Sequence, residues 1–164
     1  MDSTEDIIVD WWDNVSFLFR EETQLTLGDI GRLGEKITLR YEEKRTGSKP
    51  RWESIDSNYS GYDIASRKDY DINETILIEV KSSTKKLDEA KMIITRNEWD
   101  VATCDYNSKR YFFYLWLLGT QNKLAIIPAT LIKNHVPTDV GGGQWKTIEI
   151  PFNLFGQYFT EYID

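Results

Sequence analysis

Residues 75–82 read Thr-Ile-Leu-Ile-Glu-Val-Lys-Ser, an apolar and β-branched run that is typical of a strand inside a sheet. Side chains alternate between the two faces of a strand, so Glu79 and Lys81 share one face while Ile78 and Val80 point to the other. A carboxylate and an ammonium group on one face, opposite an apolar face, indicate a functional site. This segment therefore predicts both a strand of the sheet and a place for chemistry.

Helical and strand patterns follow one another along the rest of the chain, and their order predicts an α/β fold. An acidic amphipathic helix packed on the core is expected over about residues 4–20. A second helix is expected from Asp29, as its N-cap, to about Glu43, and a third, capped by Asn97, over about 98–105. Strands are expected over about residues 52–57, 62–66, 75–82, 91–95, 111–118 and 123–127. A central mixed β-sheet flanked by helices follows from this order.

Length and composition fit one domain with a substantial core. The chain has 164 residues, 40% of them hydrophobic, so we expect a single domain over residues 1–164. No apolar run approaches the roughly 18 residues that a membrane span needs, and the acidic first residues lack the basic start of a secretory signal. We therefore expect a cytoplasmic protein with no membrane partner.

The negative charge is concentrated at the N-terminus. The chain carries a net charge of -7, and residues 1–31 hold eight acidic residues against one basic residue. The remainder is neutral, with basic residues gathered around the strand segments. An acidic extension repels a polyanion unless it folds away from the binding surface, so a nucleic-acid-binding chain of this kind is expected to need help from a partner.

Cysteine and histidine are too few to build a thiolate or imidazole metal site. Cys104 and His135 are the only residues of their types, which excludes an internal disulfide and structural zinc. A Cys-His nucleophile pair is disfavoured because His135 lies in a polar segment and Cys104 in a helix-like one. Any metal is therefore expected to have oxygen ligands.

Asp63, on the strand expected before residues 75–82, completes a minimal set for such a metal. Glu-x-Lys occurs three times in the chain, but only the sequence Glu79-Val80-Lys81 lies in an apolar β-branched run. Two neighbouring carboxylates form a hard oxygen site suited to Mg²⁺, which keeps several of its waters. Such an ion can orient a water for attack on a phosphate, and a nearby lysine can stabilise the charge that develops.

Several short motifs resemble known proteins. Asp63 together with Glu79-Val80-Lys81 resembles the Asp…(Glu/Asp)-x-Lys signature of the PD-(D/E)XK nucleases, which include many restriction endonucleases. The surrounding sequence is similar to the domain at the C-terminus of the plant protein NO VEIN and in bacterial restriction or defence proteins. The similarity covers about residues 31–118 and is carried by Gly34-Glu35, Tyr41-Glu42, Gly61-Tyr62-Asp63-Ile64, Ile78-Glu79-Val80-Lys81-Ser82-Ser83 and Ile94-Thr95-Arg96-Asn97-Glu98-Trp99.

The resemblance implies a restriction-endonuclease-like core with a divalent metal, Mg²⁺ or its substitute Mn²⁺. It implies that Asp63, Glu79 and the Val80 carbonyl are metal ligands, and that Lys81 is either the base that positions the attacking water or a group that stabilises charge. An acidic residue from the first core helix would join them, and we favour Glu35.

Two positions qualify this assignment. Glu42 competes with Glu35, since the two lie seven residues apart on nearly the same helical face. Tyr62 stands where the family name has proline, a position that varies among such enzymes.

The function expected from the resemblance is that of a Mg²⁺-dependent endonuclease that hydrolyses DNA in restriction or antiviral defence, with RNA as an alternative substrate. A homodimer, or a partner protein for recognition or regulation, is expected to supply target recognition. The residues expected to contact nucleic acid are Lys85, Lys86, Arg96 and Asn97.

A second hypothesis is a non-catalytic module that binds nucleic acid or protein through the same fold. Each candidate residue also has an ordinary structural interpretation. Asp63 caps a turn in that reading, Glu79 pairs with Lys81, and the other charged residues lie on a solvated surface.

Overall fold

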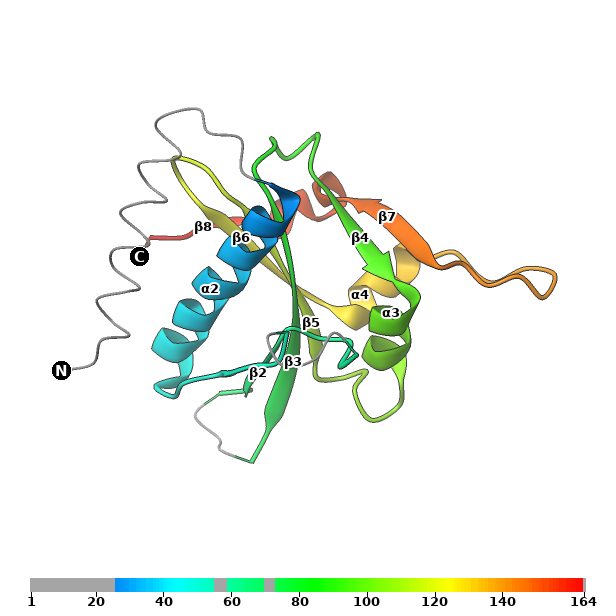
Figure 1. Cartoon of the computed structure of the whole chain (residues 1–164), viewed down its shortest axis with the longest axis horizontal. Coiled ribbons are helices and arrows are strands. Elements are labelled where there is room, and N and C mark those ends of the chain that lie inside the picture. Colours follow the sequence, from blue (N-terminus) through cyan, green and yellow to red (C-terminus); the bar gives the residue numbers. More distant parts are fainter. Residues whose placement is uncertain (1–25, 55–58, 70–72, 164) are drawn as a thin grey trace.

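Two packed layers surround a mixed sheet in the computed structural model, which describes residues 26–54, 59–69 and 73–163 (Figure 1). Within these ranges six strands form one sheet in the order β1-β2-β3-β5-β6-β8, and β4 and β7 form a separate two-stranded sheet. The strands are β1 Arg51–Trp52, β2 Ile64–Arg67, β3 Thr75–Ser83, β4 Lys91–Thr95, β5 Tyr111–Leu117, β6 Lys123–Pro128, β7 Thr147–Pro151 and β8 Thr160–Glu161. The helices are α2 Leu27–Thr46, α3 Arg96–Thr103 and α4 Ala129–Ile132, with 3-10 turns η1 Lys133–His135 and η2 Phe152–Tyr158.

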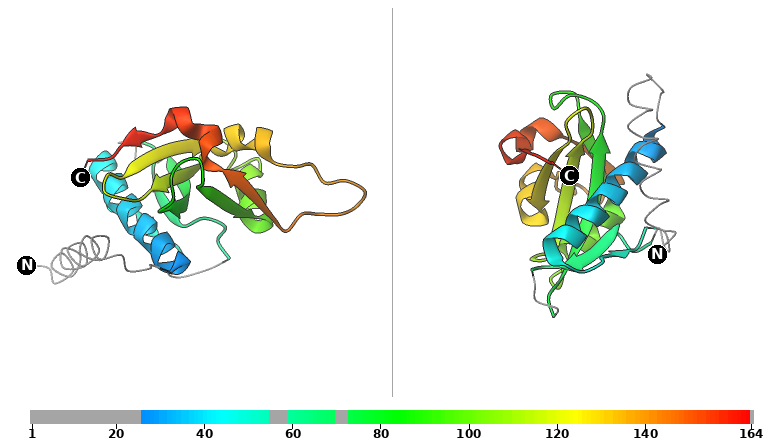
Figure 2. Two further views of the ribbon diagram at one scale, coloured as in Figure 1. Left: turned by 90° about the horizontal axis from the view of Figure 1, so that it is seen from above. Right: turned by 90° about the vertical axis from the view of Figure 1, so that its left-hand side faces the viewer.

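The sheet is mixed because β3 and β5 run parallel, whereas its other neighbouring strands are antiparallel. A parallel pair needs a long connection that crosses a face of the sheet. Here β4 and α3 form that connection, and they lie on the face opposite α2 (Figures 1 and 2). The predicted α/β fold with a central mixed sheet flanked by helices is confirmed.

Alternation along the strands gives the sheet two apolar faces. On one face, α2 packs Leu33 and Ile37 against Ile78 and Val80 of β3 and against Trp116 of β5. The other face packs under α3, α4, β4 and η2, and its core residues include Leu77, Trp99, Phe113, Phe152 and Phe155. The central strands are therefore buried on both sides, and charged side chains on them are enclosed by protein.

Both helix starts differ from the prediction in the same way. Thr26 is the N-cap of α2, and the predicted cap Asp29 instead occupies the third helical position and closes a capping box with Thr26. Thr95 likewise caps α3, closing a box with Glu98, so the prediction of Asn97 as cap is wrong. A threonine that is followed three residues later by an acid is the sequence signature of this motif, and here it outweighs the capping tendency of Asp29 and Asn97.

Three strands also differ from expectation. β1 ends at Trp52, whereas the sequence predicts a strand over about residues 52–57. β2 begins at Ile64 rather than at residue 62, so Asp63 lies just before the strand. The segment predicted over 91–95 forms β4, but it pairs with β7 outside the central sheet. The helix predicted over about 4–20 lies outside the described residues.

None of the helices in the described part of the chain is long and apolar enough to cross a membrane.

Gly34 lies where α2 packs against Ser82 and Val80 of β3, and we expect Gly34→Ala to destabilise the protein. A Cβ at this position would lie 1.7 Å from Ser82 Oγ and 3.0 Å from Ser82 Cβ. Forcing such a contact costs about 1–3 kcal/mol. Gly31→Ala is the matched control, because it has open space around its added methyl group and gains up to about 1 kcal/mol of helix propensity. Urea unfolding of both variants measures the difference, and equal stabilities would contradict the close helix–sheet packing.

Candidate active site

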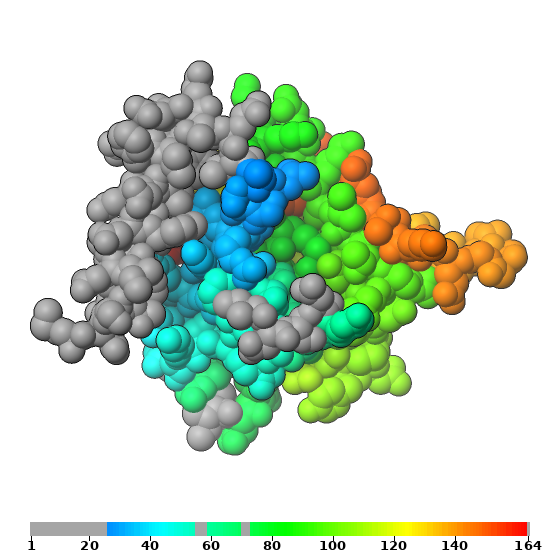
Figure 3. Space-filling view, in the orientation of Figure 1, coloured from blue at the N-terminus to red at the C-terminus, as the bar shows by residue number. Residues whose placement is uncertain are grey.

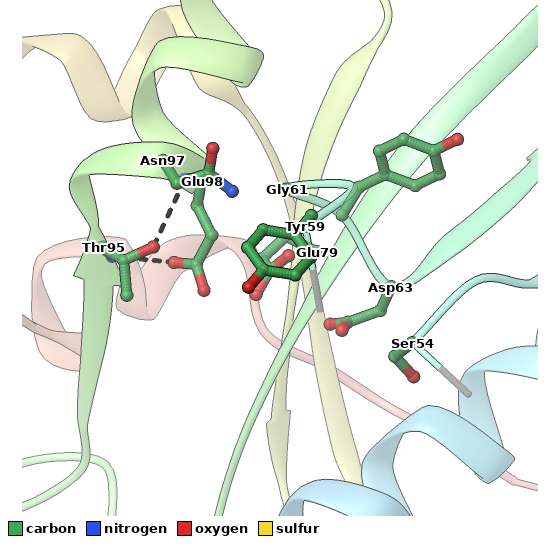
Figure 4. Close-up of a pocket in the computed structure, with 9 residues that line it drawn as sticks. Ser54, Tyr59, Gly61, Asp63, Glu79, Thr95, Asn97 and Glu98 are labelled. Atoms are coloured by element: carbon green, nitrogen blue, oxygen red, sulfur yellow. Dashed lines mark hydrogen bonds between the residues drawn. The ribbon is translucent and has the colours of Figure 1, made fainter. Parts of the chain in front are cut away.

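A pocket of about 430 Å³ lies between the β1–β2 segment, β3 and the start of α3. In the space-filling view, the surface is hollowed between the first turns of α2 and the β4–α3 segment (Figure 3). The close-up shows carboxylates from separate elements facing this space (Figure 4). The pocket is lined by Ser54, Tyr59, Gly61, Tyr62, Asp63, Glu79, Thr95, Asn97 and Glu98.

The pocket opens where the β2–β3 ladder ends. The last paired residues are Ile64 and Ile78, and Asp63 N–H donates to the Ile78 carbonyl over 2.9 Å. Beyond this point the Asp63 side chain takes the place of a strand, because its Oδ2 accepts a hydrogen bond of 2.8 Å from Val80 N–H. The Asp63 carboxylate is thereby fixed against the edge of β3.

The Val80 carbonyl points to this same open edge. The N–H and C=O groups of one strand residue point to the same side, and successive residues alternate. The backbone groups of Leu77 and Ser83 bond toward the β5 side. Val80, three residues from each, therefore directs its backbone groups toward Asp63.

Lys81 lies between two carboxylates that come from different elements. Its Nζ is 2.8 Å from Glu79 Oε1 and 3.1 Å from Glu98 Oε2. The three side chains are mostly buried, with 15% of Lys81, 6% of Glu79 and 17% of Glu98 exposed. The expected juxtaposition of Glu79 and Lys81 on one face of the strand is thus observed, and Glu98 joins them.

Tyr111 holds the loop that forms one wall of the pocket. Its hydroxyl donates to the Gly61 carbonyl over 2.5 Å and lies 3.5 Å from Glu79 Oε2. Gly61 has φ 70°, and a Cβ there would lie 2.6 Å from a methyl group of Val101. Only glycine fits this position, so the glycine before Tyr62 and Asp63 sets the path of the loop.

The electrostatics of the pocket disfavour two ionised carboxylates side by side. Burial raises the pKa of Asp63 to about 7, and nearby Glu35 and Glu98 contribute to the rise, whereas the Val80 N–H and Lys81 oppose it. Burial also raises the pKa of Glu79, with Asp63 and Glu98 adding to the effect against the opposing Lys81. Burial opposes the charge of Lys81, but Glu79 and Glu98 outweigh it and raise its pKa. A positive charge between Asp63 and Glu79 would relieve this repulsion.

Glu35 and Glu42, the two candidates for the acidic residue from the first core helix, lie in different surroundings. Glu35 Oε2 accepts hydrogen bonds from Trp52 Nε1 and from the hydroxyl of Ser54, which lines the pocket. Glu42 is fully buried and binds Arg45 and the Tyr114 hydroxyl, which lies 2.7 Å from Glu42 Oε1. Glu35 thus lies behind Ser54, one of the pocket residues, whereas Glu42 is engaged in the core under α2, and the choice of Glu35 as the helix acid stays a prediction.

The four residues expected to contact nucleic acid differ in their positions relative to the pocket. Asn97 lines the pocket, whereas Lys85 and Lys86 are exposed in the turn between β3 and β4. Arg96 is held by Asp100 at 2.8 Å and by Asp139 at 2.9 Å. A phosphate contact by Arg96 therefore requires it to exchange these partners, and the role of all four residues stays a prediction.

Sequence reasoning missed Glu98 as a pocket residue and treated it as a helix-start residue. It is both, since its carboxylate accepts from Thr95 N–H over 2.8 Å (Figure 4) and also accepts from Lys81 Nζ over 3.1 Å. The Thr-x-x-Glu pattern could have located the helix start, but the meeting with Lys81 depends on how the β3–β5 crossover packs. The exposed ring of Tyr59 and the hydroxyl of Tyr111 were missed as well.

Among the residues that the structure describes, no group of three or more acidic, histidine or cysteine side chains is arranged to hold a metal ion. Asp63 and Glu79 nonetheless come from adjoining elements and face one pocket. Two carboxylates with waters are a common way for proteins to hold Mg²⁺.

Comparison with known proteins gives one match. The family described as "Protein NO VEIN, C-terminal" matches residues 34–127, more than half of the chain. The matched range contains α2 from Gly34 onward, β1 to β5 and nearly all of β6, and so includes all the pocket residues. No curated protein and no solved structure matches.

Proposed function

This chain belongs to the family of the C-terminal domain of protein NO VEIN, and on that premise we propose that it is a metal-dependent nuclease of the PD-(D/E)XK type that hydrolyses DNA. One observation carries the proposal. Asp63 and Glu79 line a single pocket at the open edge of β3, where burial raises the pKa of both carboxyl groups, and Lys81 is in contact with Glu79. Perturbed ionisable groups gathered in a cleft are typical of catalytic sites.

The donor set fits a divalent cation with oxygen ligands. Asp63 and Glu79 would hold it, and the Val80 carbonyl points to the same edge of β3. Mg²⁺ is usually bound through one or two carboxylates and several waters, so these groups suffice without a third acidic side chain. When bound, the ion would supply an activated water and stabilise charge on the phosphate.

Lys81 and Glu35 have separate roles beside the proposed metal ligands. Lys81 keeps its proton at neutral pH because its pKa is raised, so it acts as a positive charge and not as a base. Placed beside Glu79, its ammonium group would orient the water and neutralise charge on the phosphate. Glu35 lies behind Ser54 and makes it harder for Asp63 to ionise, which favours a cation beside Asp63.

The charge of the pocket supports a metal requirement for substrate binding. Asp63, Glu79 and Glu98 outnumber Lys81, so ionisation of the acids would leave a phosphodiester facing net negative charge. A divalent cation reverses this sign locally and allows a phosphate to enter. We propose Asn97, Lys85 and Lys86 as further contacts to the nucleic acid, and Arg96 once it leaves Asp100 and Asp139.

The overall charge supports the need for a partner. The chain carries a net charge of -7, which weakens general attraction to DNA. We propose that a second copy or a recognition protein supplies target binding, in a restriction or antiviral defence setting inside the cell.

Incubation of supercoiled plasmid with the protein in Mg²⁺, in Mn²⁺ and in EDTA tests the proposal. We expect open-circular or linear product with either metal and none with EDTA. Asp63→Asn, which removes a proposed metal ligand, is expected to lose this activity. Asp88→Asn makes the same chemical change at an exposed position outside the pocket and is expected to retain full activity. Matched DNA and RNA strands in the same assay separate the two substrates, because only RNA offers a 2′-hydroxyl.

A wild-type chain that binds DNA but cuts nothing under any of these conditions would contradict the nuclease proposal. That result would support the alternative, a non-catalytic binding module on the same fold.

A further inference from the structure

We infer that Glu98 is a positioning residue that holds the Lys81 ammonium and so leaves Glu79 available to a divalent metal. The inference rests on the proposed function, because it concerns the metal proposed between Asp63 and Glu79. It assigns a task to a residue of α3, an element that supplies none of the proposed metal ligands.

The geometry of β3 places the Lys81 ammonium in competition with a metal for the Glu79 carboxylate. Glu79 and Lys81 are two residues apart on the same face, and their charged atoms are 2.8 Å apart. An ammonium at this distance competes with any cation for the Glu79 carboxylate. With Glu79 as its sole partner, Lys81 would have to leave a buried ion pair whenever a metal bound, which is costly in a mostly buried site.

Glu98 offers Lys81 a second carboxylate at 3.1 Å, from a different element, α3. Lys81 can therefore keep an ion pair while Glu79 turns to a metal. The ammonium also stays beside the pocket residues Glu79 and Glu98, as the proposed charge-stabilising role requires.

The capping box of α3 fixes the Glu98 carboxylate that binds Lys81. The same oxygen, Glu98 Oε2, accepts from Thr95 N–H over 2.8 Å and from Lys81 Nζ over 3.1 Å. The Glu98 backbone N–H in turn donates to Thr95 Oγ1 over 3.3 Å. Glu98 is thus held to the helix start and is not free to follow Lys81, so the ammonium is the group whose position is set.

Two conservative variants separate this role from simple attraction between Glu98 and a cation. Glu98→Gln keeps the length of the side chain and the acceptor of the capping box but removes the charge. Glu98→Asp keeps both the charge and a competent cap, as Asp29 shows in α2, but it is one methylene too short to serve Thr95 N–H and Lys81 together.

The experiment is a calorimetric titration of the purified chain with Mn²⁺ alone, without nucleic acid. We expect both Glu98 variants to bind Mn²⁺ roughly 10- to 100-fold more weakly than the wild type, the usual loss for a residue that supports a metal ligand. Glu89→Gln changes the exposed first residue of another Glu-x-Lys, Glu89-Ala90-Lys91, and is expected to bind Mn²⁺ as the wild type does. Thermal unfolding of the three variants shows whether each is folded.

Each outcome decides the matter. Weaker binding by both Glu98 variants supports the inference. Weaker binding by Glu98→Gln alone would mean that only charge matters and would overturn it, as would wild-type affinity in both. A wild-type chain that binds no Mn²⁺ would overturn the proposed function itself, and this result is distinct from the others.

Discussion

Asp63→Asn is expected to abolish metal-dependent cleavage while making the folded protein more stable at pH 8. The change removes a proposed metal ligand, and loss of a group that stabilises transition-state charge costs at least about 10²–10³-fold in rate. Asparagine keeps an oxygen that can accept from Val80 N–H, so the end of the β2–β3 ladder is preserved. Activity and stability should therefore change in opposite directions.

The gain in stability should depend on pH. The pKa of Asp63 is raised from 3.8 to about 7 in the folded protein, so ionising it there costs more than in the unfolded chain. The cost is fully present above pH 7 and disappears as the pH falls toward 4. Each pKa unit corresponds to about 1.4 kcal/mol, and because the side chain is partly open to solvent we expect a gain of about 1–3 kcal/mol at pH 8.

Urea unfolding at pH 5 and pH 8, with plasmid cleavage in parallel, measures both effects. Asp88→Asn, an exposed position, should change neither. A destabilised Asp63→Asn protein would show that the carboxylate is a structural cap and not a strained site residue.

Lys81→Met is expected to cause the largest loss of stability among the pocket variants. The substitution leaves Glu79 and Glu98 buried without their shared counter-ion, and breaking a buried pair in this way costs about 3–5 kcal/mol. The pairing raises the pKa of Lys81, so its stabilisation is present below the unfolded pKa of 10.5 for as long as Glu79 and Glu98 are ionised. The loss should shrink at low pH, where protonation of the two acids removes the unpaired charge.

Urea unfolding of Lys81→Met and of Lys85→Met, at pH 7.5 and at pH 4.5, measures this loss of stability. Lys85 is exposed in the β3–β4 turn, so its replacement is expected to cost little. A Lys81→Met protein as stable as the wild type at pH 7.5 would mean that the acids of the pocket are neutral there. Cleavage should be lost in Lys81→Met even under conditions where the protein remains folded, because the charge beside the phosphate is missing.

The sequence predicted the central strand and its charged pair because both depend on local pattern. Alternation alone places Glu79 and Lys81 on one face, and the structure has them in contact on β3. The position of Asp63 near them was also predictable, since two short segments separated by turn residues pair as neighbours.

The features that the sequence did not predict depend on contacts between distant residues. Residues 91–95 have the composition of any strand, and their pairing with β7 joins segments more than 50 residues apart. The early end of the β2–β3 ladder follows from the Asp63 side chain binding Val80 N–H, which a residue pattern does not reveal. The capping box of α3 is readable in sequence, whereas the approach of Glu98 to Lys81 is fixed by how α3 packs on the sheet.

Crystals of the protein grown or soaked with Mn²⁺ test the central claim most directly, because anomalous scattering locates the ion without reference to activity. We predict an anomalous peak within coordination distance of the Asp63 and Glu79 carboxylates, with Lys81 still in contact with Glu98. A pocket without such a peak at saturating Mn²⁺, or a peak bound only by exposed surface carboxylates, would contradict the proposal that these two acids form a metal centre.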